Sequence, residues 1–595
     1  MFFGICICDE NGLDLWQDAV RRHVAWLGST ACAESFTAGG KGAHVVWAGD
    51  RPLDVQPHAP AASDYLTLTP QDGIQPVAGL ATDEHLRRWL TDEVSPVQIR
   101  IGVSLDTGQL FAAVPPVCVE QLHIAKVAGG WALSTDLRFL ARLSGADLNE
   151  RGVYGLFRYG IVPPPMTLFK GIKCVHGGHL LTITPDSEAP IVEAFFRLSP
   201  PAAEPPQPMV AEAKVRDTLD EILASTPAAS IVHFSGGMDS SLIAARFAAL
   251  GRRDVTLVNC AFGPQDEAGQ KALKIAAHLG LRCEQFMWSP SGIPEVLGRI
   301  GKDYSFPFGD PSLVPGNLLA HESLPLAETS GMAIHGVGTG PMFGQRTPLR
   351  EKLKPLHRIP PPLRHAIAET YHWFGLWRQD SSIERAVGFL RRSLEMPKIQ
   401  PPRPGQHPME GIAYAVPKAV NAHLSDAALY CAQVFAAGQR TEGLFGTALH
   451  LQHQISAITA GPLGARGVRT LGAFTEPRML RCAFSLQQEE KCPGGVPRGV
   501  LNNLLLKSLP SEWIYLPGRS FVAPFREIYA HPAMRSLINN VVLSRDNPLL
   551  DYCNAKVMHE MLERLQNGRT VSIRARRFLA TFVFASLWLR QAGLV

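Results

Sequence analysis

The stretch Ser230–Leu250, SIVHFSGGMDSSLIAARFAAL, decides the fold. Its first five residues, SIVHF, predict a short buried strand, and Ser241–Leu250 predicts a helix. Between them stands the turn Ser235-Gly-Gly-Met-Asp-Ser240. A tight turn that leads from a strand into a helix N-terminus offers unpaired N–H groups and a positive dipole end to an anion. The sequence therefore predicts a phosphate-binding loop at this place.

The residue types in the turn suit that role. Gly236 and Gly237 allow the backbone to approach a ligand closely, and Ser235 and Ser240 offer hydroxyl donors. Asp239 stands where a carboxylate could hold a metal ion against phosphates. The alternative is an ordinary strand–turn–helix junction in which Asp239 and Ser240 only cap the helix. No Lys follows the glycines, so the loop is not a Walker A motif.

Strands and helices alternate around this loop, which predicts β-α-β units and a parallel sheet. Expected strands are Ser230–Phe234, Val255–Ala261, Arg282–Met287 and Met332–Gly336, and expected helices are Val210–Ala224, Ser241–Leu250 and Ala268–Leu279. The segment from Leu424 to Val595 is expected to be largely helical, with a buried helix at Phe578–Leu589.

The first ~195 residues are instead expected to consist of short strands separated by turns. Expected strands there are Met1–Cys8, Gln98–Val103, Gln109–Val114, Val153–Ile161 and Leu180–Ile183. The Pro-rich stretch Ser199–Pro208 then predicts a domain boundary, because proline continues neither a helix nor a sheet ladder.

Composition excludes several classes of protein. The 595 residues predict more than one domain, and 46% hydrophobic residues exclude wholesale disorder. The net charge of +4 is spread along the chain and predicts no nucleic-acid partner. The 11 scattered cysteines indicate neither a zinc site nor a disulfide framework. Without a membrane span or a signal peptide, the expected location is the cytoplasm.

The loop resembles the PP-loop of ATP pyrophosphatases, which split ATP into AMP and pyrophosphate while they activate a carboxylate. The resemblance implies that the pyrophosphate end of ATP is surrounded by Ser235, Gly236, Gly237, Asp239 and Ser240. It also implies that Val258, near the end of the next strand, lies close to the adenine; the alternative there is a plain core strand.

The order of the domains resembles that of the asparagine synthetase superfamily. A segment of the form F-x-G-I-x-x-x-x-x-G-H, which closes the N-terminal domain in that family, is carried here by Phe169, Gly171, Ile172, Gly178 and His179. The resemblance implies an α/β fold class: an N-terminal Ntn-hydrolase-like αββα domain at 1–198, a linker at 199–208, and a doubly wound parallel-sheet PP-loop domain with a helical C-terminal part at 209–595.

A second loop, His335-Gly-Val-Gly-Thr-Gly-Pro-Met-Phe-Gly-Gln345, looks like the family's second ATP-site loop. The resemblance places Gly336 and Gly338 at the nucleotide. The family's metal-binding Asp falls on Gly340, which leaves Asp239 and, upstream, Asp310 as the expected Mg²⁺ ligands; a turn Asp before Pro is the alternative for Asp310. ATP and Mg²⁺ are the implied cofactors.

Two further departures concern catalysis. A working glutaminase of this type starts with Met-Cys, whereas here Cys6 and Cys8 lie inside the first strand, so glutamine hydrolysis is not expected. The family's late Arg-x-Lys element is represented by Arg519 alone, which the resemblance makes a candidate catalytic residue. Lys507 and Arg498 are nearby candidates, for which solvated helix positions are the favoured interpretation.

A lost glutaminase beside a retained synthetase domain resembles lasso-peptide cyclases and β-lactam synthetases, and of the two the lasso cyclases resemble this chain more closely. The resemblance implies an ATP-dependent amide ligase that adenylates an Asp or Glu side chain of a precursor peptide and lets the peptide's N-terminal amine attack. A leader peptidase and a leader-recognition protein are the implied partners. The alternatives are an asparagine synthetase that uses free ammonia and a degenerate homologue that binds a nucleotide without catalysis.

Overall fold

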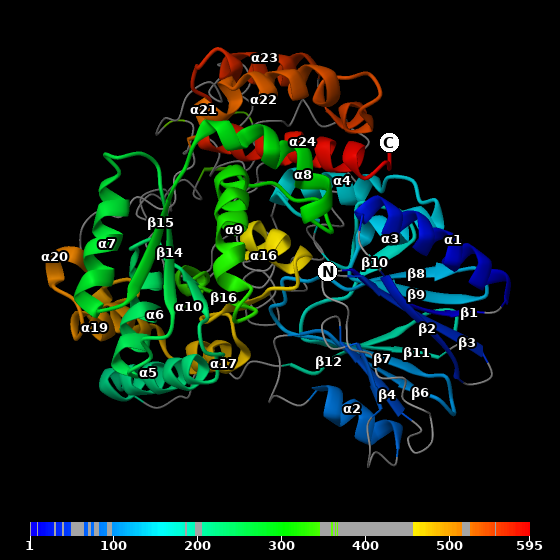
Figure 1. The fold of residues 1–595 in the computed structure, drawn as a ribbon, viewed down its shortest axis with the longest axis horizontal. Helices are drawn as coiled ribbons and strands as arrows, with labels where there is room; N and C mark the ends of the chain where they lie inside the picture. The colour runs from blue at the N-terminus through cyan, green and yellow to red at the C-terminus, as the bar shows by residue number, and fades with distance from the viewer. Residues whose placement is uncertain are drawn as a thin grey trace.

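The computed structural model describes residues 2–8, 10–28, 31–38, 41–48, 65–69, 73–76, 82–91, 98–162, 164–184, 187–196, 205–344, 359–360, 363, 366, 383, 456–514, 524–553 and 555–595. They form a mixed α/β structure with a parallel sheet, as the sequence predicts (Figure 1). Within these ranges, no helix has the length and apolar character needed to span a membrane.

The parallel sheet has five strands in the order β15-β14-β13-β16-β17. The strands are β13 (Ile231–His233), β14 (Thr256–Ala261), β15 (Arg282–Met287), β16 (Met332–His335) and β17 (Arg469–Gly472). The first four were expected. The fifth lies within the C-terminal segment that is expected to be largely helical, and it pairs in parallel with β16. Numbered along the chain, the order is 3-2-1-4-5, which is that of a doubly wound sheet.

Alternating side chains bury both faces of this sheet. On one face, residues such as Val232 and Leu257 pack in a single apolar cluster with helices α5, α6, α7, α17 and α19. On the other face, Ile231 and Val258 pack against α9 and α16. The helices are α5 (Pro208–Ala224), α6 (Met238–Ala249), α7 (Glu267–Leu279), α9 (Leu313–Ala327), α10 (Thr339–Phe343), α16 (Ser456–Ala465), α17 (Pro477–Ser485), α18 (Gln488–Lys491), α19 (Gly499–Leu506) and α20 (Ser511–Ile514).

The N-terminal part contains two six-stranded antiparallel sheets. One has the order β10-β8-β9-β1-β3-β2, and the other has the order β12-β11-β7-β6-β4-β5. The strands are β1 (Phe2–Cys8), β2 (Ala31–Ala38), β3 (Lys41–Ala48), β4 (Tyr65–Thr69), β5 (Gly73–Pro76), β6 (Arg100–Ser104), β7 (Leu110–Val114), β8 (His123–Val127), β9 (Gly130–Ser134), β10 (Ile172–Cys174), β11 (His179–Ile183) and β12 (Ile191–Ala194).

The inner faces of the two sheets share one apolar core, in which Ile5 and Leu133 of the first sheet meet Val103 and Leu181 of the second. Helices α1 (Glu10–Leu27) and α3 (Leu137–Ser144) cover the outer face of the first sheet, and α2 (Asp83–Thr91) covers the second (Figure 1). The layers are therefore helix, sheet, sheet, helix. The assignment of this part to an Ntn-hydrolase-like domain stays a prediction.

One predicted strand is wrong. Val153–Ile161 lies largely in helix α4 (Glu150–Tyr159), which Asn149 caps through a hydrogen bond from the Arg151 N–H. Val153, Leu156 and Phe157 are fully buried, and their spacing of three and four places them on one helical face. That face packs on the C-terminal helix. An apolar run of this length fits a buried strand or a buried helix, and this packing favours the helix.

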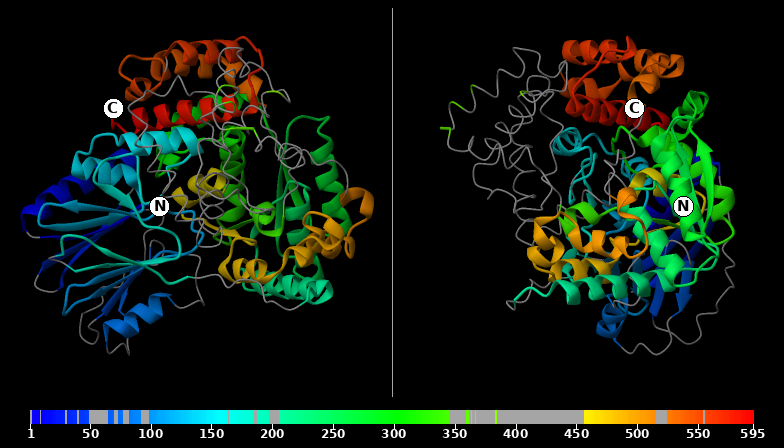
Figure 2. Two further views of the ribbon diagram at one scale, coloured as in Figure 1. Left: turned by 180° about the vertical axis from the view of Figure 1, so that it is seen from behind. Right: turned by 90° about the vertical axis from the view of Figure 1, so that its left-hand side faces the viewer.

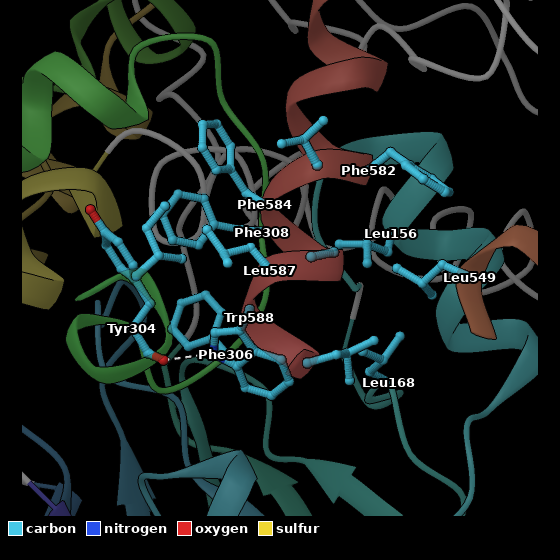
Figure 3. Packing of buried hydrophobic residues seen from close by; sticks show 14 of the residues in the cluster. Leu156, Leu168, Tyr304, Phe306, Phe308, Leu549, Phe582, Phe584, Leu587 and Trp588 are labelled. Carbon is cyan, nitrogen blue, oxygen red and sulfur yellow. Dashed lines mark hydrogen bonds between the residues drawn. The ribbon is translucent and has the colours of Figure 1, made fainter. Parts of the chain in front are cut away.

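The C-terminal helix α24 (Ile573–Gln591) joins the two parts of the molecule (Figures 1 and 2). It contacts α4 of the N-terminal part and α8 (Ile293–Asp303) of the other. In Figure 3 its aromatic residues pack among side chains from both, and the indole Nε1 of Trp588 donates a 2.7 Å hydrogen bond to the Tyr304 carbonyl. Helices α21 (Phe525–Ala530), α22 (Pro532–Leu537) and α23 (Ala555–Gln566) form a further layer above it. Short 3-10 turns at Pro290–Gly292, Pro493–Gly495 and Pro548–Tyr552, and a π-helical turn at Ile538–Val542, complete the described elements.

Most of the predicted linker, residues 199–204, lies outside the described residues, and so does Arg519. The division into domains at this linker stays a prediction. The chain resumes before Pro208, which occupies the first turn of α5, where a missing N–H costs no helical hydrogen bond.

Candidate nucleotide site

The candidate site lies at the point where the strand order of the parallel sheet reverses. β13 and β16 are neighbours in the middle of the sheet, although 98 residues lie between His233 and Met332 in the sequence. In doubly wound sheets, the crevice outside the carboxyl ends of such strands is where ligands bind. Here the Ser235–Ser240 loop follows β13, and the loop that begins at Gly336 follows β16.

Hydrogen bonds among its own residues shape the first loop. The Ser235 N–H donates to Ser240 Oγ at 3.2 Å, and the Gly237 N–H donates to Ser235 Oγ at 3.2 Å. The two hydroxyl oxygens lie 3.2 Å apart. Gly237 is the N-cap of α6 and no side chain caps this helix, so Asp239 and Ser240 lie inside the first turn. The interpretation of these two residues as simple helix caps is therefore wrong, and the first N–H groups of α6 remain available to an anion.

Two glycines bring other backbone close to this loop. Gly236 has a φ of 66°, in the left-handed region that suits glycine, and a Cβ atom on it would lie 3.0 Å from Ala272 of α7. A Cβ atom on Gly336 would lie 3.0 Å from the Ser240 nitrogen. The second loop therefore packs directly against the first, and the structure brings together the predicted residues of both. Gly338 is the N-cap residue of the short helix α10.

Arg498 also reaches this place, from the start of α19. Its Nη1 lies 3.3 Å and 3.5 Å from the two carboxylate oxygens of Asp239 and 3.4 Å from Oγ1 of Thr339. Partial burial raises the pKa of the Asp239 carboxyl, while the Arg498 charge and a hydrogen bond from Thr339 act in the opposite direction. The favoured sequence interpretation of Arg498 as a solvated helix residue is wrong. That of Lys507 agrees with the structure, since Lys507 is exposed and pairs with Glu212.

Two histidines end the central strands beneath the loops. Burial lowers the pKa of His233 to about 4 and that of His335 to about 3, so both rings are neutral near pH 7. His233 Nε2 lies 3.4 Å from the hydroxyl of Ser323, whereas neither ring nitrogen of His335 has a hydrogen-bond partner among the described residues. Neither histidine could be recognised from the sequence as part of this site, because a histidine in an apolar strand gives no signal of its surroundings.

Other predicted residues lie apart from this contact network. Val258 is fully buried in the core beneath α9, and its carbonyl accepts a 2.7 Å hydrogen bond from the Phe234 N–H just before the loop. Asp310 accepts a 2.7 Å hydrogen bond from the Ser312 N–H. Burial raises the pKa of its carboxyl, and this hydrogen bond and the charge of Arg577 in α24 offset only part of the rise. Their roles at adenine and metal stay predictions.

The described residues do not form a magnesium site by themselves. Both oxygens of Asp239 face a guanidinium, and no group of three or more His, Cys, Asp or Glu suited to a metal occurs in the part of the chain that the structure describes. The residue set fits an anion better than a cation, because it combines open helix N–H groups, two hydroxyls and an arginine.

In the N-terminal part, Cys6 and Cys8 lie within β1, which pairs with β3 on one side and β9 on the other. Both side chains are buried. Because each residue is internal to a strand, neither thiol has a free α-amine of its own residue beside it.

Comparisons with known proteins relate the middle of the chain to asparagine synthases. The family model described as asparagine synthase matches residues 214–439, a range that includes the Ser235–Ser240 loop and the Gly336 loop. Proteins of Mycobacterium bovis and Mycobacterium tuberculosis, each described as "Putative asparagine synthetase (glutamine-hydrolyzing)", are 28% identical over 286 residues. The match covers 44% of this chain and 42% of those relatives, so the chain spans less than half of their length.

Among solved structures, the glutamine phosphoribosylpyrophosphate amidotransferase from B. subtilis is 12% identical with a TM-score of 0.19, and it covers 48% of this chain and 65% of its own. A structure described as the allosteric regulatory enzyme of purine biosynthesis is 12% identical with a TM-score of 0.21, covering 48% and 64%. At these scores neither likeness carries an argument about this chain.

Proposed function

We propose that the chain is an ATP-dependent carbon–nitrogen ligase of the asparagine synthase type that forms an acyl-adenylate and releases AMP. The observation that carries the proposal is the meeting of the Ser235–Ser240 loop and the Gly336 loop at the switch point of the parallel sheet. A nucleotide whose β- and γ-phosphates lie over open N–H groups and hydroxyls has its α-phosphate at the edge of this cradle. The asparagine synthase family match over residues 214–439 supports the same reaction class.

In the proposed reaction, a carboxylate oxygen of the substrate attacks the α-phosphorus of ATP, and pyrophosphate leaves. An amine then attacks the acyl carbon, AMP leaves, and the amine proton passes to solvent or a base. The loop N–H groups and the Ser235 and Ser240 hydroxyls stabilise the negative charge that develops on the pyrophosphate. No step is assigned to Mg²⁺, because the residues that the structure describes do not form a site for it.

The amine is proposed to come from a source other than glutamine. Cys6 and Cys8 are buried within a strand that is paired on both sides, so neither suits a nucleophile that must meet glutamine. The N-terminal sheets then serve as a partner that packs on the synthetase part through α24 rather than as a source of ammonia.

The finer proposal is a macrolactam cyclase that joins an Asp or Glu side chain of a precursor peptide to the peptide's own N-terminal amine. Its support is the resemblance to lasso-peptide cyclases, including Phe343-Gly344-Gln345 at the end of the second loop. A leader peptidase and a leader-recognition protein are the partners that this proposal requires. Holding both peptide ends together would supply much of the rate, because the attack becomes intramolecular.

Exchange of labelled pyrophosphate into ATP tests the proposal. The purified chain is supplied with a precursor peptide encoded beside its gene, or with aspartate and ammonium. Exchange that requires the peptide, with loss of one water in the product mass, supports the cyclase. Exchange with aspartate in place of the peptide favours an asparagine synthetase that uses ammonia. Binding of ATP without exchange under either condition would indicate a degenerate nucleotide-binding homologue. Asp239→Ala should weaken the exchange, because it removes the carboxylate that orients Arg498.

A further inference from the structure

We propose that Arg498 is a pyrophosphate-binding residue that gives the phosphate loop its fixed positive charge. The inference rests on the proposed function, since it names a ligand contact of the same site. Arg498 lies beyond residues 214–439, so the family match does not include it.

The pairing of Arg498 with Asp239 leaves most of the guanidinium unused. Only Nη1 contacts the Asp239 and Thr339 oxygens, at 3.3–3.5 Å, which is long for a charge-assisted hydrogen bond. Nε and Nη2 make no hydrogen bond to any residue that the structure describes. Arg246 on α6 shows the contrast, since its Nε and Nη2 each donate to one oxygen of Asp220 at 2.7 Å. Arg246 is a satisfied structural pair, whereas Arg498 keeps donors for a ligand.

The backbone of Arg498 has an unfavourable conformation that the surrounding structure maintains. Its φ of 55° and ψ of 30° lie in the left-handed region, which residues with a Cβ atom rarely adopt. Its N–H donates a 3.2 Å hydrogen bond to the carbonyl of Phe343, the last residue of α10. The start of α19 is thereby tied to the second loop, and the side chain is directed to Asp239. Uncommon backbone conformations of this kind cluster where a side chain serves a ligand.

Negative charge accumulates at the loop when pyrophosphate forms, and a nearby cation would stabilise it. Pyrophosphate leaves with several negative charges, and Asp239 adds another at the same place. A guanidinium that retains free donors can bind phosphate oxygens through two parallel N–H groups. The side chain of Arg498 is 34% exposed, so it can meet a ligand that arrives from solvent. Because Asp239 holds only one nitrogen, it orients the guanidinium without saturating it.

The test measures binding of pyrophosphate, ATP and AMP to the full chain by isothermal titration calorimetry. Arg498→Ala is expected to weaken pyrophosphate and ATP about tenfold or more, as loss of charged hydrogen bonds does, and to leave AMP within about twofold. Arg498→Lys should fall between wild type and Arg498→Ala. Lys507→Ala is the matched control, because Lys507 is a cation at the other end of α19 that pairs with Glu212. It should bind all three ligands as the wild type does.

Equal losses for AMP and pyrophosphate would overturn the inference, because they would indicate a structural role. Unchanged pyrophosphate binding in Arg498→Ala, or no pyrophosphate binding by wild type, would overturn it as well. If Arg498→Ala does not fold, Arg498→Gly replaces it, since glycine suits the observed φ. The assay needs no acyl transfer: selective loss of pyrophosphate binding in a chain that catalyses no exchange would sustain the inference and defeat the ligase. Normal binding by the variant in a chain that does catalyse exchange would do the reverse.

Discussion

Gly336 lies so close to Ser240 that a Cβ atom added to it would stand 3.0 Å from the Ser240 nitrogen and 3.1 Å from the Asp239 carbonyl carbon. Both neighbours are backbone atoms in the first turn of α6, which cannot yield as the end of a flexible side chain would. The two loops that end β13 and β16 therefore share one van der Waals surface.

Gly336→Val is expected to weaken ATP binding about tenfold or more, because misplacing the phosphate loop by even a fraction of an ångström spoils its hydrogen bonds. Titration of ATP against the variant measures the effect. Gly298→Ala is the control, since a Cβ atom on Gly298 would meet nothing within 4 Å. Wild-type affinity in Gly336→Val would show that the two loops need not touch when ATP binds.

Arg498→Gly should separate stability from binding. Glycine adopts the left-handed conformation without the cost of about 1–2 kcal/mol that a Cβ atom incurs there. The unfolded chain gains conformational entropy with glycine, which offsets part of that gain, so we expect a melting temperature equal to or slightly above that of the wild type. Pyrophosphate binding should nevertheless fall. A clear drop in melting temperature, measured by scanning calorimetry, would contradict the view that Arg498 is strained for the sake of its ligand.

The strand–loop–helix unit at Ser230–Leu250 could be predicted because its signal is local. Strand, glycines, hydroxyls and helix follow one another from Ser230 to Leu250, and each residue type has a role that its neighbours define. The same holds for β15, whose bounds the sequence pattern predicts without error.

What sequence analysis missed depends on distant contacts. Arg498 was a candidate basic residue with a solvated position favoured, because it is 259 positions from Asp239 and nothing near it in the chain indicates that contact. β17 has four residues and acquires its strand identity from pairing with β16. α4 was misread because Val153, Leu156 and Phe157 suit a buried strand or a buried helix until α24 is present to receive them.

The buried histidines predict acid sensitivity. The pKa of His233 falls to about 4 and that of His335 to about 3, against 6.5 in an unfolded chain. Below pH 6.5 the unfolded state therefore binds protons that the folded state refuses, and the free energy of unfolding falls by about 1.4 kcal/mol per pH unit for each histidine, down to about pH 4. Asp136, whose pKa is lowered, loses its contribution only below its unfolded value of 3.8, outside this window.

His335→Met should remove one histidine from this titration, because methionine fills the space without a proton-binding group. Urea unfolding at pH 7 and pH 5.5 measures the loss in the free energy of unfolding. Hydrogen exchange of the β13 and β16 amides at the same two pH values reports the loss locally. The loss between the two pH values should be smaller in the variant by about 1.4 kcal/mol. An equal loss in both proteins would mean that His335 is already protonated in the folded state or exposed to water.

A buried ionic cluster connects the N-terminal part of the molecule to α8. Asp136 accepts hydrogen bonds from the Arg138 N–H at 2.9 Å, from Arg138 Nε at 2.8 Å and from His23 at 3.1 Å. Burial alone would raise the pKa of Asp136, yet the charges and hydrogen bonds of Arg138 and His23 hold it far below its usual range. Arg138 also donates to the carbonyls of Gly301 and Lys302, near the end of α8, so one guanidinium links α3 to α8.

Arg138→Met is expected to destabilise the protein by about 3–5 kcal/mol, because it leaves Asp136 buried and charged without its main partner. The double variant Asp136→Asn with Arg138→Met should lose less than the sum of the two single losses, since it leaves no uncompensated carboxylate. Urea unfolding measures the cycle, and limited proteolysis reports whether the N-terminal sheets loosen first. Additive losses would show that the two side chains are not coupled. Loosened sheets with unchanged ATP binding would show that the cluster holds the two parts together without shaping the phosphate loop.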